Sequence, residues 1–116
     1  MNFYFVPYHI VKDKIQLIIE SNKEDFEKHY GDVEVDYNEF ETLSALGMAF
    51  VALMVDTDLA GFAGFVVNHN ATHKEVEAEN VVFYIDKKYR GKHFSELLDF
   101  SKKEFQKMGV NKIVAT

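Results

Sequence analysis

The sequence predicts an α+β domain, in which a mixed, mostly antiparallel sheet is flanked by helices in the order β-α-α-β-β-β-α-β. Apolar positions repeat at helical spacing in the first part of the chain and again near its end. Between these parts, strand-like apolar runs alternate with short polar turns. A chain of 116 residues with 47% hydrophobic content is enough for one domain, residues 1–116, and too short for two.

The first part of the chain is predicted to hold a short strand followed by helices. Residues 2–6 form an apolar strand, and isoleucines at helical spacing predict a helix over residues 10–20. Ser21 and Glu24 form a capping-box pair for a second helix. Asp36 offers the next N-terminal cap and predicts a further helical turn or two.

The middle and the end of the chain are predicted to complete the sheet. Residues 48–55 and 59–68 are apolar at nearly every position and are joined by an acidic turn, so they should pair antiparallel. Residues 76–86 form a third, β-prone strand after a polar loop. Helical spacing then resumes over residues 94–108. A last strand, residues 110–115, should run parallel to the strand before this helix, because the helix crosses over between them.

Composition and charge restrict the possible functions. With 19 acidic and 13 basic residues the chain offers no broad basic face, so we expect no nucleic-acid partner. There is no cysteine, which excludes thiolate sites and favours a cytoplasmic location. The longest apolar run, residues 47–55, is far shorter than the about 20 residues that cross a bilayer, so no membrane association is expected. His69 and His73 lack a third ligand, and no metal site is expected.

The segment between Ile85 and Phe94 combines the features that hold a phosphate group. A strand ends, a helix begins, and cations gather at Lys87, Lys88, Arg90 and Lys92. A helix N-terminus presents unpaired N–H groups and partial positive charge, to which lysine and arginine add full charges. Gly91 lets the backbone approach a ligand closely. The spacing matches neither the dinucleotide fingerprint nor the P-loop, so another phosphate ligand is expected.

The same segment resembles the GNAT superfamily of N-acetyltransferases. The run Tyr89-Arg90-Gly91-Lys92, followed by Leu97-Leu98, is similar to the signature that follows the fourth strand of that family. His93 and Ser95 stand where the family usually has small residues. The predicted order of elements also resembles the family from Phe3 to Ala115.

The resemblance implies an acetyl-CoA cofactor, with backbone groups along its pantetheine arm, loop amides on its pyrophosphate and lysines near its outer phosphate. The residues implied for cofactor binding are Val82, Phe83, Tyr84, Lys88, Arg90, Gly91, Lys92, His93, Phe94 and Ser95. A solvated surface is the alternative role for any single lysine among them.

The resemblance also implies transfer of an acetyl group to a primary amine by direct attack. Glu77 and Glu79 lie on the strand where related enzymes place a carboxylate that takes the amine proton. Glu79 is expected to lie nearer the thioester and is the first catalytic candidate. An ordinary surface carboxylate is the alternative. Tyr84 is the second candidate, with the alternative of a core tyrosine whose hydroxyl reaches the surface.

The acidic stretch from Glu20 to Glu41 indicates which class of acceptor the protein would bind. By the resemblance it walls the acceptor pocket and would attract a cationic amine, either a small molecule or a protein side chain. A solvated helix face is the alternative.

A non-catalytic domain that binds a basic protein partner through these acidic helices is a second functional hypothesis. The family domain usually continues with a helix and two strands beyond the equivalent of Thr116, so we expect either a fragment, a naturally short form or completion by another subunit. The open edge of the last strand would favour a homodimer.

Overall fold

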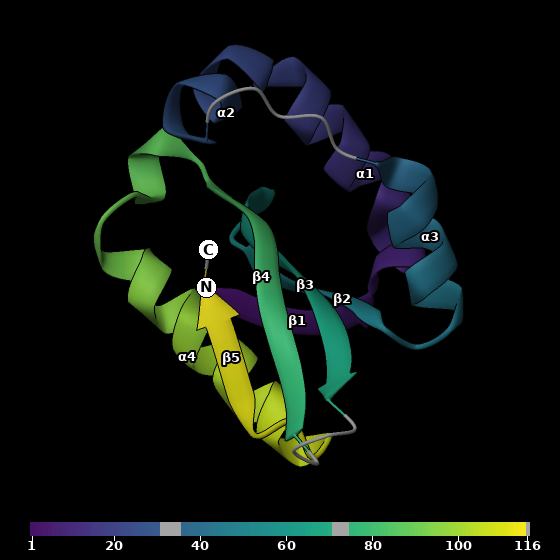
Figure 1. The fold of residues 1–116 in the computed structure, drawn as a ribbon. Helices are drawn as coiled ribbons and strands as arrows, with labels where there is room; N and C mark the ends of the chain where they lie inside the picture. The colour runs from purple at the N-terminus through teal and green to yellow at the C-terminus, as the bar shows by residue number, and fades with distance from the viewer. Residues whose placement is uncertain (31–35, 71–74, 116) are drawn as a thin grey trace.

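A five-stranded sheet, with its strands in sequence order, forms the centre of the molecule (Figure 1). The structure is a computed structural model that describes residues 1–30, 36–70 and 75–115. The strands are β1 (Asn2–Pro7), β2 (Ala49–Val55), β3 (Leu59–Asn70), β4 (Glu75–Ile85) and β5 (Lys112–Ala115). Neighbouring strands are antiparallel except β4 and β5, which are parallel. The predicted α+β class and its mostly antiparallel sheet are confirmed.

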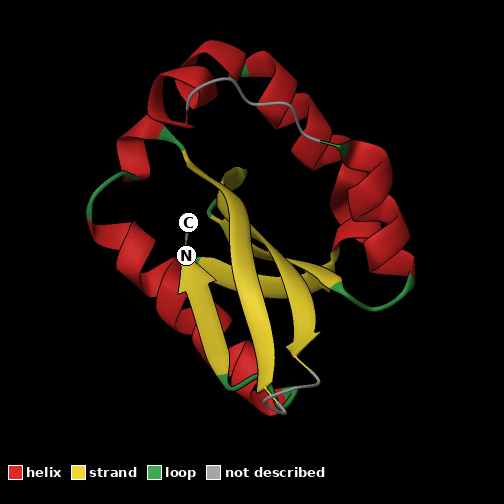
Figure 2. Ribbon diagram, viewed as in Figure 1, coloured by secondary structure: helices red, strands yellow, loops and turns green. Residues whose placement is uncertain are grey.

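Helices cover both faces of this sheet (Figure 2). One face packs against the first three helices, which are α1 (Tyr8–Ser21), α2 (Lys23–Tyr30) and α3 (Tyr37–Ala45). The other face packs against α4 (Lys92–Lys107), which a short 3₁₀ helix, η1 (Lys87–Tyr89), joins to β4. None of the helices in the described ranges is both long and apolar enough to cross a membrane.

The helix boundaries follow local capping, with one difference from the sequence prediction. Ser21 is the last residue of α1 and not the cap of α2, so the predicted capping box is wrong. The chain breaks at Asn22, whose side-chain amide donates to the Ile18 carbonyl at 2.8 Å and whose own carbonyl accepts from the Phe26 amide. The cap at Asp36 is confirmed, because its Oδ1 accepts from the Glu39 amide at 3.0 Å. The turn or two expected there is a nine-residue helix, α3.

A β-bulge divides β4 into two halves. Phe65 of β3 pairs with Asn80, whereas the preceding Gly64 pairs with Val82, so that Val81 is an extra residue in the ladder. The Asn80 side chain spans the bulge, because its Nδ2 donates to the carbonyl oxygens of Gly64 at 3.0 Å and Val82 at 3.1 Å. The bulge moves every later side chain of β4 to the face opposite the one that strict alternation would give it.

The two parallel strands pair only before the bulge. β5 pairs with β4 from Glu77 to Asn80, and the ladder between them ends there. Within the described part of the chain, β4 therefore continues from Val81 to Ile85 with β3 as its single neighbour. A stretch of β4 backbone with an open edge thus leads directly to the start of α4.

Candidate active site

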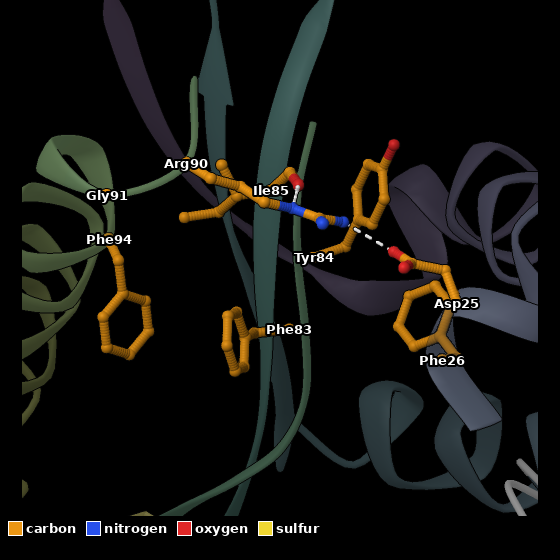
Figure 3. A pocket seen from close by; sticks show the side chains of 8 residues that line it. All are labelled: Asp25, Phe26, Phe83, Tyr84, Ile85, Arg90, Gly91 and Phe94. Atoms are coloured by element: carbon orange, nitrogen blue, oxygen red, sulfur yellow. Dashed lines mark hydrogen bonds and ion pairs between the residues drawn. The ribbon is translucent and has the colours of Figure 1, made fainter. Parts of the chain in front are cut away.

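A cavity of about 560 Å³ lies where α2 approaches the end of β4 and the start of α4 (Figure 3). We call it the β4–α4 cleft. Its lining residues are Asp25, Phe26, Phe83, Tyr84, Ile85, Arg90, Gly91 and Phe94. The predicted cofactor residues that it includes are Phe83, Tyr84, Arg90, Gly91 and Phe94. The strand end and the helix start named from the sequence thus share one cleft.

The walls of the β4–α4 cleft are aromatic. The rings of Phe83 and Phe94 lie 4.8 Å apart on one side, and those of Phe26 and Tyr84 lie 5.8 Å apart on the other. Phe94 keeps 39% of its surface exposed, although it is a large apolar residue. Apolar walls beside the open edge of β4 suit an extended ligand that is partly apolar and carries amide groups.

The N-terminus of α4 opens onto the same cleft. Gly91 occupies the N-cap position with a φ of 101°, and no side chain caps the helix there. The first turn of α4 contains no acidic residue. The first N–H groups of a helix have no partner within the helix, and they carry partial positive charge. This end of the cleft is therefore suited to an anion such as a phosphate.

Arg90 ties the loop before α4 to two other elements. Its Nε donates to the Ile85 carbonyl at 2.9 Å, and its guanidinium forms an ion pair with Asp25 of α2 at 2.5 Å (Figure 3). Two of its five N–H donors thus hold α2 against the end of β4. In this structure, the charge of Arg90 shapes the cleft as well as adding positive potential to it.

We predict a small effect on stability when this ion pair is lost. Asp25→Asn should lower the free energy of unfolding by about 1 kcal/mol or less, because partly exposed ion pairs contribute little. Urea denaturation measures the change. Glu104→Gln is the matched control, because Glu104 is similarly exposed and pairs with Lys107 at 3.3 Å. A loss of about 3 kcal/mol or more would contradict this and indicate a fully buried pair.

The two unusual residues of the loop do not line the cleft. His93 lies with its Nδ1 3.4 Å from the Glu96 carboxylate, and its ring meets the edge of Tyr89 at 5.9 Å. Ser95 is exposed in the first turn of α4. The larger side chain of His93 is thus directed to its own helix and to η1, so the departure from a small residue leaves the cleft open.

The remaining predicted cofactor residues lie outside the cleft. Val82 points to the α1 face, where it lines a small apolar cavity. Lys88 is exposed on η1, with its Nζ 5.3 Å from the centre of the Tyr89 ring. The backbone of Lys92 begins α4, but its side chain lies outside the described part of the structure.

The two predicted catalytic residues share a face of the sheet without being in contact. Glu79 pairs with Val66 and Tyr84 with Phe62, and these partners lie on the same face of β3. The bulge produces this arrangement, since strict alternation would place Glu79 and Tyr84 on opposite faces. Their positions are four residues apart along β3, or about 13 Å at the usual strand rise. Glu79 is half-buried and does not line the β4–α4 cleft, whereas Tyr84 does.

Burial raises the pKa of Tyr84. It raises the pKa of the Tyr84 hydroxyl above its ordinary value, and the negative charges of Asp86 and Asp25 raise it further, against an opposing effect of Arg90. The hydroxyl is protonated at neutral pH, as an unperturbed tyrosine already is. It can donate a proton or a hydrogen bond to a group in the cleft.

The resemblance implies that the acidic stretch containing α2 walls an acceptor pocket, but the sequence did not indicate that Asp25 and Phe26 line the same cleft as the end of β4. Asp25 and Phe26 carried only local signals, an acidic stretch and a helical apolar position. Nothing in that spacing indicates that α2 meets the end of β4. The described residues contain no group of three or more His, Asp or Glu side chains that could hold a metal ion. His73 lies outside the described residues.

Residues 15–116 match the family model described as the acetyltransferase (GNAT) family. The chain belongs to this family. The match spans α2, the bulged β4 and the uncapped start of α4, which are the elements that form the cleft. GNAT acetyltransferases transfer acetyl groups, so the β4–α4 cleft is the candidate active site of an acetyltransferase. No curated protein matches the sequence.

Solved GNAT structures share the fold at low sequence identity. The ribosomal-protein-alanine N-acetyltransferase from Brucella melitensis biovar Abortus has a TM-score of 0.66 at 15% identity, over 100% of this chain and 80% of that one. An aminoglycoside acetyltransferase from an uncultured soil metagenomic sample, in complex with sisomicin, has a TM-score of 0.72 at 11% identity, over 99% and 76%. A predicted acetyltransferase from Clostridium acetobutylicum, with acetyl-CoA, has a TM-score of 0.71 at 14% identity, over 99% and 79%.

Proposed function

We propose that this protein is an acetyl-CoA-dependent N-acetyltransferase, which transfers an acetyl group to a primary amine by direct attack in the β4–α4 cleft. The observation that carries the proposal is the uncapped N-terminus of α4, which opens onto a cleft with aromatic walls. A ligand with a pyrophosphate at one end and an apolar, amide-containing arm fits both features. Bound acetyl-CoA supplies a thioester, whose carbonyl carbon is open to attack by an amine.

The residues of the cleft would hold the two ends of the cofactor differently. The amides from Gly91 to Ser95 would bind the pyrophosphate, with Lys88 and Lys92 adding charge near an outer phosphate. The backbone of β4 from Val82 to Tyr84, which β5 does not cover, would run along the pantetheine arm. Phe94, exposed beside Phe83, would cover the arm.

Glu79 would accept a proton in the reaction, and Tyr84 would donate one. Glu79 is the candidate base, which takes a proton from the acceptor ammonium, directly or through a water molecule. Tyr84, which is protonated at neutral pH and lines the cleft, is the candidate donor. In direct attack the amine nitrogen and the thiol sulfur are bonded to the same carbon, so both side chains would have to reach toward one centre from strand positions about 13 Å apart.

A cationic amine is the acceptor that this chain favours. The chain carries a net charge of -6, and α2, which walls the cleft, has in its first turn Glu24 and Asp25, of which Asp25 is paired with Arg90. A negative potential at a cleft raises the local concentration of cations. The sisomicin complex supports this choice, since that protein is an aminoglycoside acetyltransferase of the same fold.

The test is release of the CoA thiol from acetyl-CoA in the presence of a panel of amines, including aminoglycosides and lysine peptides. We expect amine-dependent thiol release together with a product one acetyl group heavier. The proposal would be overturned if no amine in the panel led to thioester cleavage and the protein instead bound a basic protein partner that high salt releases. That pair of results would support the non-catalytic alternative.

We predict that Glu79→Gln separates catalysis from cofactor binding. The kcat should fall about a hundredfold, because the amide cannot accept the ammonium proton. The Kd for acetyl-CoA should stay unchanged, since Glu79 lies outside the cleft. Glu77→Gln is the matched control on the same strand. Equal losses in both variants would show that Glu79 has no catalytic role.

A further inference from the structure

One pair of opposite charges lines the β4–α4 cleft. Among its lining residues in the described part of the chain, Arg90 is the only basic one and Asp25 the only acidic one. The two form the ion pair that joins the loop before α4 to α2. The formal charges of the lining side chains therefore cancel, although the cofactor proposed for this cleft is an anion.

The ion pair holds the Arg90 guanidinium on the α2 side of the cleft. Figure 3 shows the Arg90 side chain running from its place beside Gly91, past Ile85, to the carboxylate of Asp25. There its Nη2 lies 2.5 Å from the Asp25 Oδ2 atom. Arg90 directly precedes the uncapped start of α4, where the pyrophosphate is proposed to bind. A cation next to that helix start is thus directed to a carboxylate of the protein itself.

A carboxylate and a phosphate group compete for the same donors of a guanidinium. The planar N–H groups of arginine match the oxygen atoms of either anion in the same two-pronged geometry. A phosphate group that approached Arg90 would have to displace the Asp25 carboxylate or bind close to its negative charge. Both alternatives reduce the free energy gained on binding.

The ion pair can open without displacing α2. The side chains of Arg90 and Asp25 are 38% and 26% exposed, so a ligand can reach both. Phe26, the next residue of α2, is buried, and its ring lies 5.8 Å from that of Tyr84. This contact between rings holds α2 against β4 independently of the charges. Release of Arg90 therefore needs only side-chain rotation, which is fast for exposed side chains.

We propose that Asp25 determines the affinity of the cleft for the cofactor, because its carboxylate competes with the cofactor pyrophosphate for the Arg90 guanidinium. The inference rests on the proposed function, in which acetyl-CoA binds at the start of α4. Arg90 pairs with Asp25 in the free protein and with a phosphate group in the complex. A variant without the Asp25 charge therefore binds the cofactor more tightly. A purely structural role for Asp25 predicts the opposite, since loss of the ion pair would loosen this wall of the cleft.

Calorimetric titration of Asp25→Asn with acetyl-CoA tests the proposal. We expect this variant to bind about three- to fivefold more tightly than the wild type, as the loss of one partly exposed ion pair allows. Glu27→Gln is the matched control, because Glu27 is a half-buried carboxylate of the same helix that does not line the cleft. It should change the affinity by less than about twofold, since solvent and salt screen its charge.

A double-mutant cycle separates the competition from a general effect of charge. In an Arg90→Gln background, Asp25→Asn should change the affinity for acetyl-CoA by less than about twofold, because there is no guanidinium to release. Two results would overturn the proposal. One is acetyl-CoA binding by Asp25→Asn that is equal to or weaker than that of the wild type, and the other is the same gain with and without Arg90.

Inorganic pyrophosphate serves as a second ligand, because it tests the competition whether or not the cleft binds acetyl-CoA. If acetyl-CoA binds neither form but pyrophosphate binds Asp25→Asn more tightly than the wild type, the proposed enzyme function is rejected and the competition stands. If acetyl-CoA binds both forms equally, the competition is rejected and the proposed function stands. If acetyl-CoA binds neither form and pyrophosphate shows no gain, both are rejected.

Discussion

Gly91→Glu is expected to weaken acetyl-CoA binding by about a hundredfold or more, which corresponds to about 2.7 kcal/mol. Gly91 has a φ of 101°, a backbone conformation that residues other than glycine adopt only with strain. The added carboxylate would also lie at the uncapped start of α4, where the pyrophosphate is proposed to bind. Calorimetric titration with acetyl-CoA measures the change.

Gly109→Glu is the matched control for this prediction. Gly109 has a φ of 82° and no atom within 4 Å of an added Cβ, as is the case for Gly91. It follows the opposite end of α4, so its substitution imposes comparable backbone strain without bringing charge to the cleft. Equal loss of acetyl-CoA binding in the two variants would mean that strain alone, and no phosphate contact, explains the effect.

Phe105→Ala is expected to cost the most stability, about 3–5 kcal/mol of the free energy of unfolding. Phe105 is fully buried, at 0% exposure, on the inner face of α4. Its ring meets those of Phe5 at 4.9 Å, Phe65 at 5.0 Å and Phe50 at 6.2 Å. Truncation would leave a cavity where strands β1, β2 and β3 pack on the helix. Urea denaturation, followed by circular dichroism, measures the loss.

Phe94→Ala separates packing from binding on the same helix. Phe94 is 39% exposed, so its truncation should cost about 1 kcal/mol or less. It should nevertheless weaken acetyl-CoA binding, because Phe94 lines the β4–α4 cleft. A Phe94→Ala variant as unstable as Phe105→Ala would show that the aromatic wall belongs to the core and is not free to cover a ligand.

The features predicted correctly from the sequence depend on contacts between near neighbours. The cap at Asp36, the turn of residues 56–58 and the glycine after α4 each depend on a few adjacent residues. The segment proposed to bind phosphate also has a local signal, because Arg90 and Gly91 precede a strongly periodic helix. Such local signals sufficed for the order of the elements and for the position of the proposed cofactor loop.

The features that the sequence did not predict depend on pairing between distant segments. The bulge at Val81 arises from the register of β3 against β4, and it decides that Glu79 and Tyr84 share a face. The second wall of the cleft depends on the approach of Asp25 to Arg90, which are 65 residues apart in the chain. The sequence places the cap of α2 at Ser21, one residue before the break at Asn22. The Asn22 side-chain amide donates to the Ile18 carbonyl of α1, and the expected capping box does not form.

A crystal structure of the protein with acetyl-CoA tests the central claim most directly. We predict that the pyrophosphate lies against the amides from Gly91 to Ser95 and that the pantetheine arm follows β4 beyond Asn80, beside the paired rings of Phe83 and Phe94. A cofactor bound elsewhere on the molecule, or no cofactor bound at saturating concentration, would contradict the assignment of the β4–α4 cleft as the active site.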